Sequence, residues 1–239
     1  AIVCGVLLVR VERQAPEPMV PLDLLTDKMI AAIAGTGLLV GFGLFGVIAY
    51  VPLFVQEGLG GGAVEAGQAL TPLIMGWVVT SMITGRVVLK VGYRPLVLAG
   101  LACIALAFAG FAWVTATQSS WLFRADLAVM GMGMGMTMLS LVLAMQNVVA
   151  RRHLGVATSF GQFTRSIGGA VGVALLGAVI GATLPSDRDP VAADMIQGIH
   201  RAFWLAAVVS GAAAVAALWI PSGRPADLIH PDHADDRQS

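Results

Sequence analysis

Charged residues are scarce in this chain. Of its 239 residues only 12% are Asp, Glu, Lys or Arg, whereas a soluble domain averages about 25%. So few charges cannot cover the surface of a water-soluble fold, and 57% of the residues are hydrophobic. The net charge is zero, which gives no electrostatic case for a nucleic-acid partner. The composition therefore predicts an integral membrane protein with the lipid bilayer as its solvent.

Residues that hold metals or carry out catalysis are also few. The two cysteines, Cys4 and Cys103, both lie in apolar runs, where a buried hydrophobic role is expected. The closely spaced His230 and His233 have no companion ligand at a metal-site spacing. The sequence has no HExxH motif, no phosphate-binding loop and no nucleophile–base pair in an apolar run. We therefore predict no catalytic residue, no metal site and no cofactor, and do not predict an enzyme.

Long uncharged runs are what the chain has instead. A transmembrane helix needs about 20 apolar residues, and six runs are long enough, one of them interrupted only by Arg165. The six runs are 29–56, 66–85, 95–123, 127–150, 154–186 and 202–223. They are continuous and do not alternate, which favours helices over the strands of a barrel. The predicted fold class is all-α, a polytopic membrane bundle of six full transmembrane helices.

The ends of the chain differ from this pattern. Residues 1–9 are apolar, but Arg10 follows too early for a full span, so we interpret them as the end of a truncated transmembrane helix. The proline-containing stretch 10–28 is predicted to be a cytoplasmic linker. The six-helix bundle would occupy 29–221, and the Pro- and Asp-rich 222–239 would be a disordered cytoplasmic tail.

Lys and Arg gather in alternate connections between the runs. The connections rich in these cations are 10–28, 86–94 and 151–153. Of the others, 57–65 and 116–120 hold none, and the last contains Arg188 and Arg201. By the positive-inside rule, the rich connections and the C-terminus are predicted to be cytoplasmic.

Arg165 is the most informative single residue. It lies about 13 Å into its predicted span, near the middle of the membrane, where a cation must face a cavity or a partner. Gln162 precedes it by one helical turn on the same face. Gln146 and Asn147 close the preceding helix on the inner side. These four are the candidate pathway residues, and two interpretations of Arg165 stay open: a substrate or coupling pathway, and a buried ion pair or carbonyl contact.

A second polar group lies at the outer side. Arg124 and Asp126 enter the fourth run from that side, and Asp126 is a candidate partner for Arg201. An outer gate and a plain interfacial anchor are both consistent with these three residues.

Glycines four residues apart recur in the runs. Such pairs let helix backbones approach closely in lipid, and smooth glycine faces would also let helices slide or bend. The pairs are Gly37 with Gly41, Gly131 with Gly135, Gly168 with Gly172, and Gly177 with Gly181.

The segment Gly85–Arg94 is a short basic turn between two apolar runs. It resembles the cytoplasmic signature loop of the major facilitator superfamily, Gly-x-Leu-Ala-Asp-Arg-x-Gly-Arg-Lys. Its glycines and cations form the candidate signature loop: Gly85, Arg86, Lys90, Gly92 and Arg94. Leu89 stands where the family has its Asp, which indicates a degenerate second copy of the loop.

Further stretches resemble the fourteen-helix drug:proton antiporter branch of that superfamily. They are Pro52–Gln56, Ala66–Pro72, the Gly131–Gly135 run with Gln146, and residues 154–157 with 165–169. The resemblance implies the C-terminal six-helix half of a secondary active transporter. It implies proton-coupled export of small drug-like compounds, amphipathic or cationic, by alternating access in a bacterial plasma (inner) membrane. The implied partners are the lipid bilayer, a small-molecule substrate, protons as coupling ion, and a missing N-terminal half that holds the coupling acids.

Two other function classes stay open at this stage. A non-transporting membrane sensor or scaffold would need no polar pathway through the bundle. An integral membrane enzyme would need a clustered acid, base or nucleophile at membrane depth, and the sequence shows none.

Overall fold

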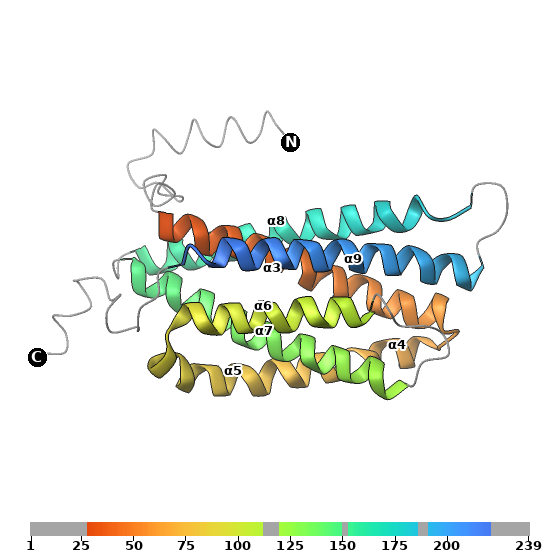
Figure 1. The fold of residues 1–239 in the computed structure, drawn as a ribbon, viewed down its shortest axis with the longest axis horizontal. Helices are drawn as coiled ribbons and strands as arrows, with labels where there is room; N and C mark the ends of the chain where they lie inside the picture. The colour runs from red at the N-terminus through yellow and green to blue at the C-terminus, as the bar shows by residue number, and fades with distance from the viewer. Residues whose placement is uncertain (1–27, 112–119, 150–152, 186–190, 221–239) are drawn as a thin grey trace, which may run out of the picture.

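A computed structural model describes residues 28–111, 120–149, 153–185 and 191–220, and these residues form helices joined by short turns (Figure 1). The elements, in chain order, are α3 (Lys28–Leu53), the π-helical turn η1 (Phe54–Gly58), α4 (Ala63–Ala69), α5 (Thr71–Val91), α6 (Tyr93–Phe111), α7 (Ser120–Val148), α8 (Leu154–Gly181) and α9 (Ala192–Ala217). The predictions for 1–9, for most of 10–28 and for 222–239 fall outside the described residues.

Six segments of the described chain are long and apolar enough to cross a membrane. They are Met29–Gly58, Ala63–Val91, Tyr93–Phe111, Trp121–Val148, Leu154–Gly181 and Ala193–Ala217. The first crossing joins α3 to η1, directly after Pro52, whose missing N–H weakens the α-helical hydrogen bonding there. The second joins α4 to α5. The predicted all-α class and its six spans are therefore confirmed.

The predicted turn at Gly85–Arg94 is wrong in its extent. Helix α5 continues through Arg86 and Lys90 to Val91, and α6 begins at Tyr93. Cations are stabilised at a helix C-terminus by the helix dipole, so charge there does not end the helix. Their long side chains also reach water while the backbone stays helical.

Gly92 alone makes the connection between α5 and α6. Its φ of 91° and ψ of 175° lie in a region that is essentially restricted to glycine. Its N–H donates to the carbonyl oxygen of Val88 at 2.9 Å, which closes the last turn of α5. Gly92 matches a glycine position of the signature loop, and the backbone conformation of this turn explains why a glycine is needed there.

The start of the last span was also predicted wrongly. Helix α9 begins at Ala192, ten residues before the uncharged run, so Arg201 lies inside a helix. Asp194 explains the early start, because its Oδ2 accepts a hydrogen bond from the N–H of Val191 at 3.1 Å. Such a carboxylate satisfies a free donor at a helix N-terminus.

The described acidic side chains and the cations of the candidate signature loop lie toward opposite ends of the bundle. Helix α5 ends, and α6 begins, at the end that holds Arg86, Lys90 and Arg94, which we call the basic end (left in Figure 1). Helices α3 and α8 also start there. The acidic side chains of the described residues lie toward the opposite end, the acidic end: Glu57, Glu65, Asp126 and Asp194.

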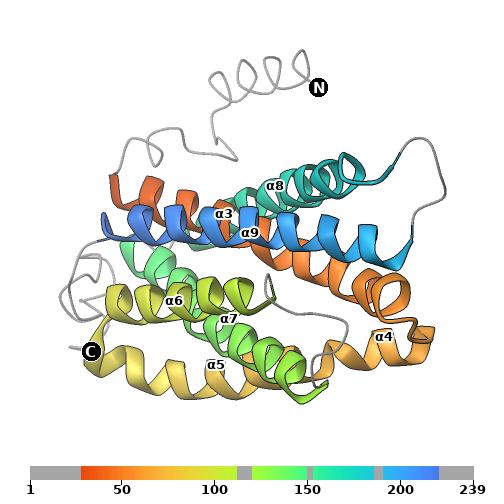
Figure 2. The ribbon, with the colours of Figure 1, turned by 45° about the vertical axis from the view of Figure 1, so that its right-hand side comes forward.

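The helices form two groups of three, as Figures 1 and 2 show from two directions. Helix α3 packs against α8 and α9, and α7 packs against α5 and α6, while α6 and α9 join the groups. The first helix of each sequential triplet thus packs on the second and third helices of the other triplet. This exchange fits two three-helix units related by a pseudo-twofold axis, as in many transporter folds.

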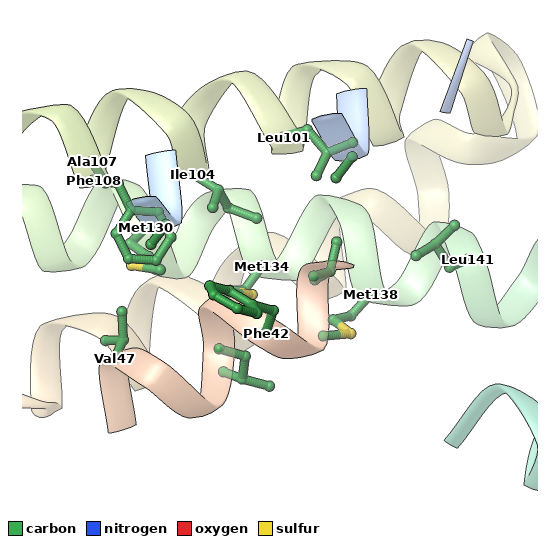
Figure 3. Close-up of a cluster of buried hydrophobic side chains, with 14 of the residues drawn as sticks. Phe42, Val47, Leu101, Ile104, Ala107, Phe108, Met130, Met134, Met138 and Leu141 are labelled. Atoms are coloured by element: carbon green, nitrogen blue, oxygen red, sulfur yellow. The ribbon is translucent and has the colours of Figure 1, made fainter. Parts of the chain in front are cut away.

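A methionine row lies at the centre of the core. Met130, Met134 and Met138 repeat every four residues on α7 and are buried. Figure 3 shows them between Phe42 of α3 and the α6 side chains that include Phe108. The core therefore fixes α7 between α3 and α6.

Glycines let the helix backbones touch where helices cross. Between α3 and α8, a Cβ added to Gly41 would collide with the carbonyl of Arg165, and one on Gly168 with the carbonyl of Leu38. A Cβ on Gly172 would collide with the backbone of Phe42, whereas one on Gly177 would meet only the side-chain hydroxyl of Tyr50. This confirms the predicted close approach for this pair of helices.

Glycines also allow close backbone approach where α5 crosses α7. A Cβ on Gly135 would lie 2.7 Å from the carbonyl oxygen of Trp77, and one on Gly131 would collide with that of Leu73. Gly37 and Gly181 have open space where the Cβ would be, so the prediction of close packing is wrong for these two.

Gly168→Ala is expected to destabilise the bundle by about 1–3 kcal/mol, because the added methyl group forces α8 away from α3. Gly181→Ala on the same helix is the matched control and should be neutral or slightly stabilising, since its Cβ meets open space. Thermal unfolding of the protein purified in detergent micelles measures both. Equal shifts in melting temperature for the two variants would contradict the assigned packing.

Candidate functional site

The predicted pathway residues Arg165 and Gln162 lie at a seam between α7 and α8. The Arg165 guanidinium reaches across the seam, and its Nη1 donates to Sδ of Met138 at 3.0 Å. Its Nη2 donates to Oε1 of Gln162, one turn away on α8. The fold therefore holds this cation through one contact with α7 and one with its own helix.

Gln146 meets α8 nearer the basic end. Its Nε2 donates to Oγ1 of Thr158 at 3.5 Å, and the Thr158 hydroxyl donates to the carbonyl oxygen of Leu154 at 2.8 Å. Three of the four predicted pathway residues thus follow one seam. The sequence analysis missed Thr158 and Met138, because a threonine and a thioether in an apolar run carry no charge to mark them.

A small cavity of about 50 Å³ lies beside the seam. Its lining comes from α3 (Ile33, Gly37), α7 (Leu141, Val142, Met145) and α8 (Ala157, Thr158, Gly161, Gln162, Arg165). The volume suits a few water molecules, whereas drug-sized ligands need pockets of about 300–1,000 Å³. The described chain therefore forms a small cavity here, in which Thr158, Gln162 and Arg165 are the polar side chains of a mostly apolar lining.

The α3–α8 crossing sets the depth of Arg165. The residue lies eleven positions into α8, about 16 Å from its start at a rise of 1.5 Å per residue. Its carbonyl faces Gly41 of α3, where any side chain would collide. The backbone is thereby held against one helix while the side chain extends to another.

The charge of Arg165 has no carboxylate partner among the described residues, where both side-chain acceptors are neutral. A guanidinium has five N–H donors and stays protonated in proteins. Asp126 is twelve residues from Met138 on α7, about 18 Å along the helix. The seam therefore carries an uncompensated positive charge at membrane depth within the described part of the chain.

Asn147 lies on a different face of α7 from Gln146. Its Nδ2 donates to the hydroxyl of Tyr93, which is 1% exposed. Successive residues on a helix are rotated by about 100°, so Gln146 faces α8 while Asn147 faces α6. The structure thus places Asn147 away from the cavity and gives it a contact that ties the α5–α6 turn to α7.

The candidate signature loop forms a basic surface. Arg86 and Lys90 are exposed on the last turns of α5, and Arg94 is half-buried in the first turn of α6. Gly92 is buried in the turn, and Tyr93 follows it directly. The segment therefore combines exposed cations with a buried anchor to α7.

The three outer gate candidates are not brought into contact. Asp126 is half-buried against Gly110 of α6, whose absent Cβ would lie 2.7 Å from the carboxylate. Arg124 and Arg201 are exposed on α7 and α9. In the described ranges no ion pair joins any two of them, so a gate remains a prediction.

No group of three His, Cys, Asp or Glu side chains in the described chain is placed to hold an ion.

The chain is similar to a known protein family. The sequence model described as Major Facilitator Superfamily matches residues 3–173. The matched range includes α3 to α7 and reaches into α8 past Arg165.

Two relatives illustrate the similarity to named proteins. "Multidrug transporter protein MdtP" of Bacillus subtilis is 35% identical over 182 residues, 76% of this chain and 34% of the relative. "Tetracycline resistance determinant" of Streptomyces rimosus is 29% identical over 169 residues, 70% of this chain and 49% of the relative. The chain therefore spans between a third and a half of the length of these relatives.

Solved structures show the same fold at low sequence identity. The tetrameric PepTSo2 structure matches with a TM-score of 0.71 and 16% identity, over 88% of this chain and 46% of the other. The proton:xylose symporter XylE matches with a TM-score of 0.64 and 14% identity, over 82% and 44%. In both cases a six-helix bundle corresponds to slightly under half of the larger protein.

Tyr93→Phe is expected to destabilise the protein by about 1–2 kcal/mol, because the Asn147 amide loses its hydrogen-bond partner. Asn147→Ala should cost a similar amount. The double variant should cost less than the sum, by a coupling energy of about 0.5–3 kcal/mol. Thermal unfolding in detergent of the four proteins in this cycle measures the coupling, and additive effects would show that the hydrogen bond contributes nothing.

Proposed function

The chain belongs to the major facilitator superfamily, and on that premise we propose that it forms the C-terminal half of a secondary active transporter that exports small drug-like compounds in exchange for protons. The observation that carries this proposal is the cavity wall with Arg165 at mid-membrane depth. Ionisable residues at that depth are costly and typically mark a transport pathway.

A second half of the transporter is proposed to complete the site. The cavity is much smaller than a drug-sized pocket, and its residue Gln162 is exposed on the surface of α8. An amide facing lipid at this depth would be costly, which supports a polar or protein-covered surface there. The length of this chain relative to its relatives supports the same partner, an N-terminal six-helix bundle.

The exposed faces of α5 and α8 are the proposed contact surface for that half. Large apolar side chains project from both helices: Ile74, Val78 and Met82 on α5, and Phe163, Ile167 and Val171 on α8. In alternating access the two bundles would rock about a midplane site between them.

Proton coupling is proposed to depend on acids outside this chain. The acidic side chains of the described residues lie toward the acidic end, away from the cavity. A coupling carboxylate needs to lie near the pathway, so we assign it to the N-terminal half. The names of the relatives, multidrug transport and tetracycline resistance, support the drug-like substrate class.

The basic end is proposed to face the cytoplasm of a bacterial cell, with the C-terminus on that side of the plasma (inner) membrane. The support is the cluster of Arg86, Lys90 and Arg94 at this end, because cytoplasmic connections carry an excess of Lys and Arg.

Arg165→Ala and Gln162→Ala in the full-length transporter are expected to lower proton-gradient-driven export at least tenfold, because both remove the polar wall of the pathway. Gln197→Ala is the matched control, since Gln197 is exposed on α9 and does not line the cavity. Export from proteoliposomes at equal protein content measures the effect. Full export by both variants would contradict a pathway role for this wall.

The orientation can be tested by cysteine labelling. In a background without other cysteines, Lys90→Cys should react with a membrane-impermeant maleimide only after the cells are opened, while Ala63→Cys should react in intact cells. These residues lie at opposite ends of the α4–α5 crossing and both are exposed. The reverse labelling pattern would invert the proposed topology.

A further inference from the structure

The Arg165 guanidinium is held by weak, neutral acceptors. Its Nη1 contacts the thioether sulfur of Met138, and its Nη2 contacts the amide oxygen of Gln162. A thioether is a weak acceptor, whereas the planar guanidinium fork matches a carboxylate or phosphate with two parallel hydrogen bonds. A carboxylate or phosphate would be the strongest partner of this guanidinium, and neither contacts it among the described residues.

No acid of the described chain neutralises this charge. The residues that line the cavity include no Asp or Glu. Along α7 the carboxylate of Asp126 lies twelve positions from Met138, about 18 Å at helical rise. The other described acids lie at the acidic end, farther from the cavity's position on α8. The cavity wall therefore has a net positive charge.

The remaining lining is apolar. Ile33 of α3, with Leu141, Val142 and Met145 of α7, faces the same space as the guanidinium. In such low-dielectric surroundings electrostatic attraction and repulsion are both stronger than in water. The wall thus offers contact area to a hydrophobic body and an ion-pairing group to one end of it, and it repels a cationic group.

We propose that this transporter prefers amphipathic anions, in which a carboxylate or other oxyanion pairs with Arg165 while an apolar body contacts Ile33 and the α7 side chains. Gln162 acts as a positioning residue, because its side-chain oxygen orients the guanidinium toward the cavity. This specificity keeps the amphipathic alternative expected from the sequence and departs from the cationic one, and it rests on the proposed transport function.

The same charge has a competing explanation. An acid from the N-terminal half would pair with Arg165 in the assembled transporter and leave no unpaired charge for a substrate. In that case a substrate anion would gain nothing from Arg165, and a cationic compound would not be disfavoured. Matched ligands that differ only in charge separate the two explanations.

The test uses the full-length transporter in lipid nanodiscs and three fluorescent anthracene derivatives that carry a carboxylate, a neutral methyl ester or a trimethylammonium group. The carboxylate should bind at least tenfold more tightly than the trimethylammonium compound. Arg165→Gln should weaken carboxylate binding at least tenfold and change ester binding less than threefold. Arg165→Lys should retain part of the preference, and Gln197→Ala should retain all of it.

Equal or tighter binding of the trimethylammonium compound would overturn the proposal, as would a carboxylate preference that survives in Arg165→Gln. Absence of carboxylate binding would overturn it too. If Arg165→Gln fails to fold, unchanged charge preference in Arg165→Lys and in Gln162→Ala would overturn it. A separate export assay with a broad compound panel distinguishes the two levels: export of cations alone refutes only the anion preference, whereas export of nothing under a proton gradient refutes the proposed function.

Discussion

Backbone contact at glycine is the constraint on which this bundle depends. Lipid tails are as apolar as leucine side chains, so no hydrophobic force drives the helices together within the bilayer. Close approach must supply the packing energy instead, and it needs positions without a Cβ. Helices α3 and α8 meet in this way at Gly41 and Gly168, α5 and α7 at Gly131 and Gly135. The α6–α7 pair follows the same rule, because a Cβ on Gly100 would lie 2.6 Å from the carbonyl oxygen of Gly133.

The candidate site is a direct consequence of one such crossing. The carbonyl of Arg165 packs against Gly41, where a Cβ would collide with it, and this contact fixes the backbone of Arg165. One turn nearer the basic end, Gly37 has no neighbour at the Cβ position and lines the cavity instead. The two glycines of this pair thus have different roles. Gly41 forms the crossing, whereas Gly37 leaves space where α3 and α8 separate. The cavity is on the basic-end side of Arg165 for this reason.

Uncharged runs predicted the number and order of the spans because charge is what the bilayer excludes most strongly. They failed at helix ends, where charge is tolerated or even favourable, as Lys90 in the last turn of α5 and Asp194 in the first turn of α9 show. When a helix is apolar on most sides, its sequence also does not indicate which face is turned toward which neighbouring helix. The sequence therefore placed Gln146 and Asn147 together, although one contacts Thr158 of α8 and the other Tyr93 of α6.

The exclusion of charge by the bilayer also made part of the site predictable. Arg165 is conspicuous because a cation in an uncharged run requires an explanation. Met138 and Gly37 carry no such signal, and their roles depend on how three helices cross in space. Similarly, the glycine spacing predicted which backbones approach, but not that Gly37 and Gly181 lie where the helices have already separated.

Aromatic side chains pack together at the acidic end of the bundle. The ring of Phe123 on α7 lies 5.6 Å from that of Phe54 in η1 and 5.6 Å from that of Phe111 on α6. Phe111 in turn lies 5.3 Å from Phe203 on α9. These rings tie four elements together near the acidic end, whereas near the basic end α3 and α8 diverge around the cavity. Among these four elements η1 has the least regular backbone, because its hydrogen bonding is shifted from the α-helical pattern.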